Sequence, residues 1–126
     1  MRGISLVFFA TGVACVCIGM CWGIWMGISD DHTFAPAHAH LNLVGWVTMA
    51  LFGVYYHLVP AAASTQLSRI HYALALIGVV MMVPGIVMVL DGRTQMFAKA
   101  GSLFTLASML VFAYTVWRNK ADPVAV

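Results

Sequence analysis

The stretch His38-Ala39-His40-Leu41-Asn42-Leu43-Val44-Gly45-Trp46 places two imidazoles at the start of an apolar run that continues to Pro60. A run of this kind is typical of a membrane-spanning helix, because about 20 apolar residues cross the hydrocarbon core of a bilayer. Ionisable side chains inside such a segment are costly and by default mark a functional site. The histidine pair therefore indicates both the class of fold and the place to look for function.

The composition of the whole chain is that of a membrane protein. Of its 126 residues, 63% are hydrophobic and 8% are charged, and the mean hydropathy is +0.95. A soluble domain of this size has too small an interior to bury so much apolar surface. Short polar breaks separate four apolar runs, at about 4–28, 38–60, 70–90 and 97–117. We expect an all-α membrane protein in which residues 1–126 form a single domain of four transmembrane helices.

The charged residues predict the orientation of these helices. If the helices alternate in direction, one membrane side receives four cations, Arg2, Arg69, Arg118 and Lys120. The other side receives Arg93 and Lys99 together with Asp30, Asp31 and Asp91. The positive-inside rule then favours both termini inside. The net charge of +2 is too small to indicate a nucleic-acid partner.

The first run is expected to remain as a helix and not to be removed as a signal peptide. It is longer than the apolar part of a signal peptide, which has about 7–15 residues. Trp22 and Trp25 near its end are typical of a membrane interface. In the following loop, Asp30 or Asp31 is expected to end the first helix, and Thr33 to cap the second with Pro36 in its first turn.

Helical geometry separates the two histidines of the pair. At about 100° per residue, the side chains of His38 and His40 point about 200° apart, so one helix cannot present both to one ion. The residues on the side of His38 are Asn42, Gly45, Met49, Phe52 and Tyr56, and those on the side of His40 are Val44, Val47, Leu51 and Val54. We expect each histidine to serve a different neighbour, with Gly45 and Gly53 allowing a flat group or another backbone to approach. The alternative is that both imidazoles are polar residues at the outer interface.

The remaining histidines and the cysteines have plainer interpretations. We expect His32 to be a solvated loop residue, His57 to lie at the inner interface beside a belt of Tyr55 and Tyr56, and His71 to be a capping or interface residue. Cys15, Cys17 and Cys21 are expected to be small packing residues on the first helix. Their alternative use is a soft copper(I) site, because thiolates select that ion.

The second and third apolar runs resemble part of the catalytic subunit of haem-copper oxidases, closest to the C-type (cbb) oxidase and nitric-oxide-reductase branch. The matching residues are His38-Ala39-His40, Val44-Gly45-Trp46, Phe52-Gly53, Tyr55-Tyr56 and Val59-Pro60 for that subunit's helix ten, and the segment from Ile70-His71-Tyr72 to Ile77-Gly78 for its helix eleven. The strong resemblance covers about a third of the chain. By order, the four helices would correspond to helices nine to twelve of the family.

The resemblance implies a haem site. In the family, the first histidine of the pair ligates the high-spin haem and the second the low-spin haem, so His38 and His40 would be the matching metal ligands. Asn42, Gly45 and Trp46 would lie with them in the cofactor-binding region. The second low-spin ligand and the copper ligands of the family lie on helices that this chain lacks, which excludes a complete oxidase site within one chain.

The missing helices imply an oligomer. The family's twelve helices form three arcs of four around a pseudo-threefold axis, and a chain that resembles one arc would rebuild the set as a homotrimer in the bacterial inner membrane. Three functions then follow as hypotheses. The first is a haem-b-binding membrane protein for electron transfer with a redox partner, haem handling or gas binding. The second is a copper-binding or copper-delivery protein that uses the outer histidines, with Cys15, Cys17, Cys21 and the methionines as soft ligands. The third is a non-catalytic structural or assembly partner. No catalytic residue is assigned.

Overall fold

The computed structural model describes residues 1–120 and consists of helices joined by short connections, with no strand among those residues. Residues 121–126 of the expected single domain lie outside the described part of the chain. The first span is α1 (Gly3–Ser29), and the second, Ala35–Leu58, is built from α2 (Ala35–His40), η1 (Leu41–Thr48) and α3 (Met49–Leu58). A short helix, α4 (Pro60–Ala63), leads to α5 (Gln66–Leu90) and α6 (Met96–Arg118). The four long helices are each long and apolar enough to cross a membrane, which confirms the predicted fold class.

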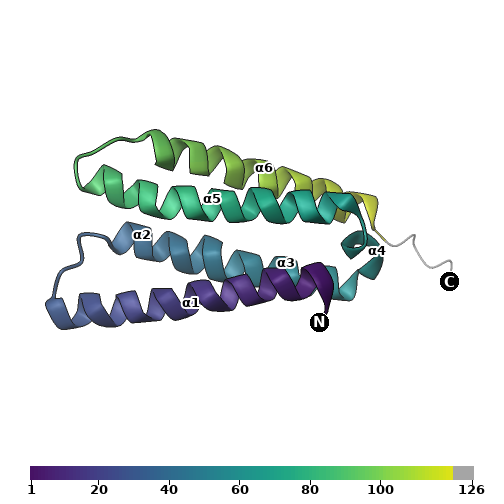
Figure 1. Ribbon diagram of the computed structural model, residues 1–126, viewed down its shortest axis with the longest axis horizontal. Helices are drawn as coiled ribbons and strands as arrows, with labels where there is room; N and C mark the ends of the chain where they lie inside the picture. The colour runs from purple at the N-terminus through teal and green to yellow at the C-terminus, as the bar shows by residue number, and fades with distance from the viewer. Residues whose placement is uncertain (121–126) are drawn as a thin grey trace.

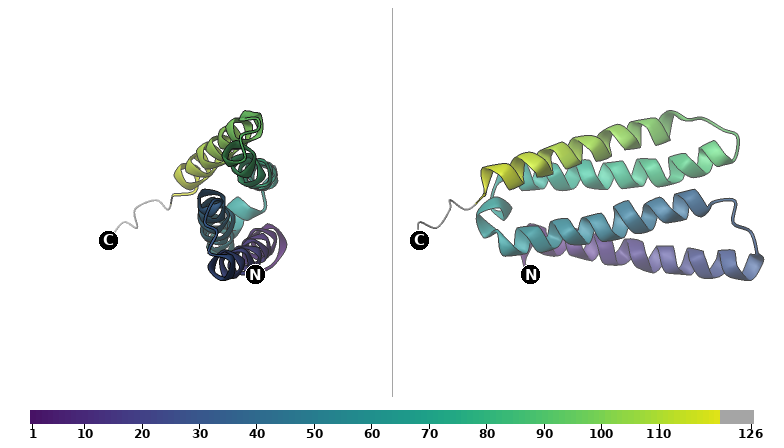
Figure 2. Two further views of the ribbon diagram at one scale, coloured as in Figure 1. Left: turned by 90° about the vertical axis from the view of Figure 1, so that its left-hand side faces the viewer. Right: turned by 180° about the vertical axis from the view of Figure 1, so that it is seen from behind.

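The four spans form two antiparallel helical hairpins that lie side by side (Figures 1 and 2). The first hairpin pairs α1 with the second span, and the other pairs α5 with α6. The N-terminus, α4 and the end of α6 lie at one end of the bundle, while the two hairpin loops lie at the opposite end (Figure 1). This topology gathers Arg2, Arg69 and Arg118 at one end and the aspartates of the two loops at the other, as the alternating-helix prediction requires.

Glycines allow the helices of each hairpin to approach closely. In the first hairpin, a Cβ added to Gly53 would lie 2.9 Å from the backbone oxygen of Ser5 in α1. In the second, a Cβ on Gly101 of α6 would lie 2.4 Å from the backbone nitrogen of Met82 in α5. Small residues at such contacts are the usual means of helix association in a membrane, where burial of apolar surface from water is unavailable.

Large apolar side chains cover the outside of the bundle. Ile28 is 82% exposed and Leu58 is 72% exposed, and many others on all four spans are also exposed. Water would make such a surface unfavourable, whereas lipid chains solvate it. The chain is therefore a multi-pass membrane protein.

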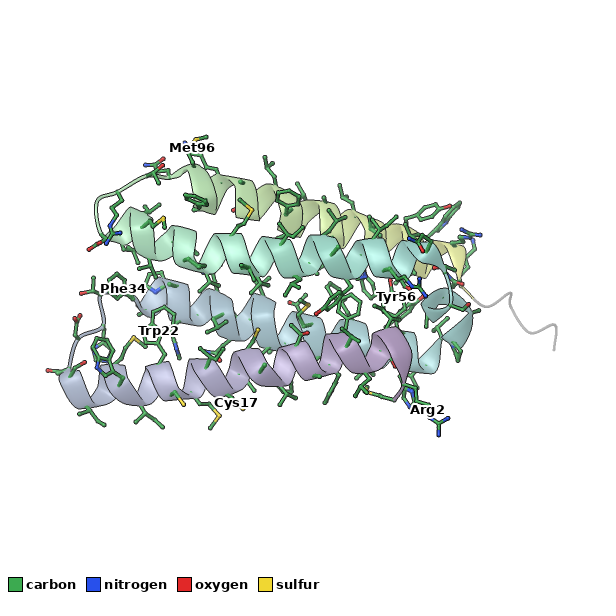
Figure 3. The ribbon with its side chains drawn as sticks, viewed as in Figure 1. Arg2, Cys17, Trp22, Phe34, Tyr56 and Met96 are labelled. Atoms are coloured by element: carbon green, nitrogen blue, oxygen red, sulfur yellow. The ribbon has the colours of Figure 1, made fainter. Side chains whose placement is uncertain are left out.

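The core between the hairpins is aromatic near the end that carries the N-terminus. It is built on Phe8, Met49, Phe52 and Tyr56, all almost completely buried. Tyr56 points into the space between the hairpins (Figure 3), so the prediction that it belongs to an interfacial belt is wrong. The prediction for His71 as a capping or interface residue is also wrong, because this side chain is 0% exposed.

The loop after α1 differs in detail from the prediction. Asp30 ends α1 in the left-handed conformation, with φ of 53°, as expected for a helix stop. Thr33 does not cap the next helix, which begins at Ala35 after Phe34 and has Pro36 in its first turn. Thr33 instead donates from its backbone nitrogen and its hydroxyl to Asp31 Oδ1, at 3.0 and 2.6 Å. These two hydrogen bonds lower the pKa of Asp31.

Candidate cofactor site

The histidine pair lies in α2, at the loop end of the second span, and the helix changes its winding directly after it. Residues Leu41–Thr48 form η1, a π-helix, in which the backbone hydrogen bonds join residues five apart. The hydroxyl of Thr48 follows the same spacing and donates to the carbonyl oxygen of Leu43 at 2.8 Å. Such π-helical segments are rare and are frequently found at functional sites.

His40 is held in one tautomer by the backbone. Its Nδ1 lies 2.8 Å from the carbonyl oxygen of Pro36, one helical turn earlier. A carbonyl oxygen only accepts hydrogen bonds, so Nδ1 must carry the proton. In the neutral imidazole, Nε2 is then the nitrogen with a free lone pair. The side chain is exposed on the outside of the bundle, and this lone pair is available to a ligand.

His38 has a different environment. It is half-buried against α1, where its ring lies edge-on to the indole of Trp22 with 6.2 Å between ring centroids. The amide nitrogen of Asn42 is 3.2 Å from its Nε2 and also donates to the backbone oxygen of His38 at 3.0 Å. His38 and Asn42 line an open groove of about 420 Å³ together with Met20, Gly23 and Ile24 of α1.

The burial of the second span follows the predicted division into two sides. On the side of His38, Gly45, Met49, Phe52 and Tyr56 are buried. On the side of His40, Val47, Leu51 and Val54 are exposed, and Leu51 reaches 62%, whereas Val44, also predicted for this side, is half-buried against the core. The two histidines therefore have different surroundings, as predicted. The neighbour of His38 is α1 of its own chain, where its ring lies against Trp22 and Gly23.

The other residues predicted for the cofactor region pack against α1. The Sγ of Cys15 lies 3.0 Å from the position that a Cβ on Gly45 would take, so Gly45 admits a neighbouring helix of the same chain. Trp46 lies over Gly12 and makes an edge-on contact with Phe9 at 6.0 Å between ring centroids. Asn42 lies against Gly19 and is the member of this set that contacts a histidine ring.

The cysteines and remaining histidines do not complete a metal site within one chain. Over residues 1–120, no group of three or more histidine, cysteine or acidic side chains is close enough to hold a metal ion. Cys15 packs at the helix contact, whereas Cys17 and Cys21 are exposed, and Cys17 points away from the bundle (Figure 3). His32 and His57 are exposed, in agreement with their predicted loop and interface positions.

The structure also reveals a buried polar pair that the sequence interpretation missed. The hydroxyl of Tyr56 in α3 lies 2.9 Å from Nδ1 of His71 in α5, and both side chains are buried. Phe8, Phe52 and Phe112 surround the imidazole, and its Nε2 has no hydrogen-bond partner. The aromatic cage leaves no room at this nitrogen for a large cofactor. The sequence feature that could have indicated this pair is a polar side chain at the end of one span, Tyr56, and another near the start of the next, His71.

No protein-family model, curated protein or solved structure matches the chain.

Proposed function

We propose that this chain is a haem-b-binding membrane protein and that His40 supplies an axial ligand through Nε2. The observation that carries the proposal is the hydrogen bond from His40 Nδ1 to the carbonyl oxygen of Pro36. Metal-bound histidines characteristically donate their second ring nitrogen to a carbonyl or carboxylate, which fixes the tautomer and makes the ligating nitrogen more basic. His40 has this arrangement on an exposed face near the loop end of a membrane span.

The surroundings of His40 suit a porphyrin. Further along the same side of the span, Leu43, Val47 and Leu51 expose apolar side chains. A flat, largely apolar macrocycle would cover these side chains while its iron is ligated by the imidazole. The donor set is also suitable, because haem iron needs only one or two protein ligands, whereas a structural zinc ion is almost always held by four.

His38 is the second candidate ligand. Its Nε2 is in contact with the amide of Asn42, so ligation by His38 would require this amide to turn away. The groove of about 420 Å³ beside His38 provides an opening towards it. His40 is the more favourable ligand of the pair, because its free nitrogen has no competing donor.

The proposal includes an oligomer. Since one chain offers His40 on an outward face, a haem with two histidine ligands would take the second from another chain. The resemblance of the motifs to one arc of the haem-copper oxidase subunit favours a homotrimer. The trimer would lie in the bacterial inner membrane with both termini of each chain on the inner side. Bound haem would supply a one-electron redox centre if both axial positions are filled by histidine, or a site for a small gas if one is open.

The first experiment is the absorption spectrum of the purified protein, expressed with added haem precursor. We expect a Soret band and, on reduction, sharp α and β bands, all lost in His40→Ala. His57→Ala is the matched control, because His57 is exposed on the same span at its other end. Native mass spectrometry in mild detergent should show a trimer.

Two results would contradict the proposal. A colourless protein that contains stoichiometric copper by elemental analysis would favour the copper function instead. A protein that binds neither haem nor copper, with an unchanged spectrum in His40→Ala, would favour a structural or assembly role. A monomer or dimer in the mass spectrum would refute the trimer separately.

A further inference from the structure

A small, partly open cavity lies between the two hairpins, next to the π-helix, and the half-exposed Met109 forms part of its wall. It leaves about 10 Å³ for the centre of a water-sized molecule. Its walls are mostly apolar, but three hydroxyl-bearing side chains line it, Thr48 from η1 and Thr105 and Ser108 from α6. A cavity of at least about 10–15 Å³ by this measure, with two to four polar partners, is what a buried water molecule requires.

The hydroxyl of Ser108 has no hydrogen-bond partner. The residue is 2% exposed, and its Oγ is one of two fully buried side-chain polar atoms without a partner among residues 1–120. A buried hydroxyl without a hydrogen bond is unfavourable, and most such groups in proteins are satisfied by the chain or by water. Since Ser108 lines the cavity, a partner there would satisfy it.

The hydroxyls of the two threonines can only accept hydrogen bonds from a molecule in the cavity. The hydroxyl of Thr48 already donates to the carbonyl of Leu43 at 2.8 Å, and that of Thr105 donates to the carbonyl of Gly101 at 2.9 Å. Each therefore keeps lone pairs but has no proton left to give. The cavity thus offers two acceptors and, from Ser108, one donor.

We propose that this cavity is a binding site for one water molecule, which bridges the two hairpins. The water would donate its two protons to Thr48 and Thr105 and accept the proton of Ser108. All three hydroxyls and the water would then be satisfied. The bridge would fix the end of η1 against α6, which makes it a specific polar link between hairpins that otherwise meet mainly through apolar contacts. It is independent of the proposed haem site.

Infrared spectroscopy tests the proposal. An isolated internal water gives a sharp O–D stretching band in D₂O, and this band shifts when the oxygen is replaced by ¹⁸O. We expect such a band in the wild-type protein and its loss in Ser108→Ala. The matched control is Ser102→Ala, because Ser102 lies on the same helix but is exposed and donates to the carbonyl of Ala98. The control should keep the band.

A double-mutant cycle gives a second and independent measurement. Ser108→Ala and Thr48→Val each remove one partner of the water, and we expect each to lower the equilibrium constant for folding by about tenfold. The double variant should lose about the same tenfold, because either change already displaces the water. The proposal is overturned if the wild type has no ¹⁸O-sensitive band, if Ser108→Ala keeps it, or if the two losses multiply. If Thr48→Val does not fold, the infrared spectrum of Ser108→Ala by itself decides whether the water is bound.

Discussion

Replacing Tyr56 with phenylalanine removes a single hydroxyl from the centre of the bundle. That hydroxyl lies 2.9 Å from His71 Nδ1, and the two residues are 1% and 0% exposed. His71 Nε2 already lacks a partner, so the change leaves both ring nitrogens of a fully buried imidazole without a hydrogen bond.

The expected loss follows from this burial. Interhelical hydrogen bonds in membrane proteins contribute about 0.6 kcal/mol on average and up to about 1.7 kcal/mol. Leaving a buried polar group unpaired costs about 1–3 kcal/mol. Phenyl rings surround His71, so no other partner can replace the phenol. We therefore expect Tyr56→Phe to lower the free energy of unfolding by about 1–2 kcal/mol.

The double variant Tyr56→Phe with His71→Phe should recover most of this loss. With both polar groups replaced by rings of similar shape, no unpaired donor or acceptor remains in the cage, and such paired replacements are nearly neutral. His71→Phe alone should be destabilising, because it removes the imidazole partner of the buried Tyr56 hydroxyl. The three variants thus form a double-mutant cycle, in which the double variant should lose less stability than the sum of the two single losses.

Equilibrium unfolding in mixed micelles, followed by circular dichroism, measures these values. Tyr55→Phe is the matched control, because the adjacent Tyr55 is less buried and its hydroxyl makes only a 3.5 Å contact with the carbonyl of Thr115. It should change stability by much less. A neutral Tyr56→Phe, or a double variant that loses the sum of the two single losses, would refute this account of the core.

Two further predictions concern the hairpin contact and the first loop. Gly101→Ala should destabilise the protein by about 1–3 kcal/mol, since its Cβ would meet the Met82 backbone at 2.4 Å and force the helices apart, whereas Gly27→Ala, with nothing within 4 Å, should be neutral or slightly stabilising in the same unfolding assay. Thr33→Val should raise the pKa of Asp31 in an NMR titration. Because that pKa is lowered in the folded state, any stability it contributes is present above the unfolded-state pKa and lost as the pH falls through the folded-state value, so the wild type and Thr33→Val should converge in stability at acid pH. An unchanged Asp31 titration in Thr33→Val would contradict this assignment.

The four spans could be predicted from sequence because membrane insertion depends on length and mean hydropathy, which are local properties. The end of α1 at Asp30 could be predicted for the same reason, because it depends on the local sequence. The division between His38 and His40 also followed from residue spacing alone. It held even though η1 departs from α-helical winding, because the average spacing of Gly45, Met49, Phe52 and Tyr56 along the span still returns them to one side.

The features that sequence reasoning missed depend on contacts between helices. Tyr56 at the end of a span has the same local pattern as an interfacial tyrosine, and only its contacts with Phe8 of α1 and His71 of α5 make it a core residue. His71 is buried for the same reason. From the sequence, Gly45 could make room either for a flat group or for another helix. The structure shows that Cys15 of α1 occupies the space beside it. The tautomer of His40 depends on one side-chain distance to the Pro36 carbonyl, which no spacing rule supplies.

The measurement that most directly tests whether His40 is the axial ligand is chemical rescue of His40→Gly, followed in the reduced-minus-oxidised absorption spectrum. We expect the variant to lose the α and β bands of haem b and to regain them when imidazole is added, because free imidazole can occupy the position of the missing side chain. His57→Gly should keep its bands without imidazole. If His40→Gly retains the wild-type spectrum in the absence of imidazole, His40 does not ligate the haem.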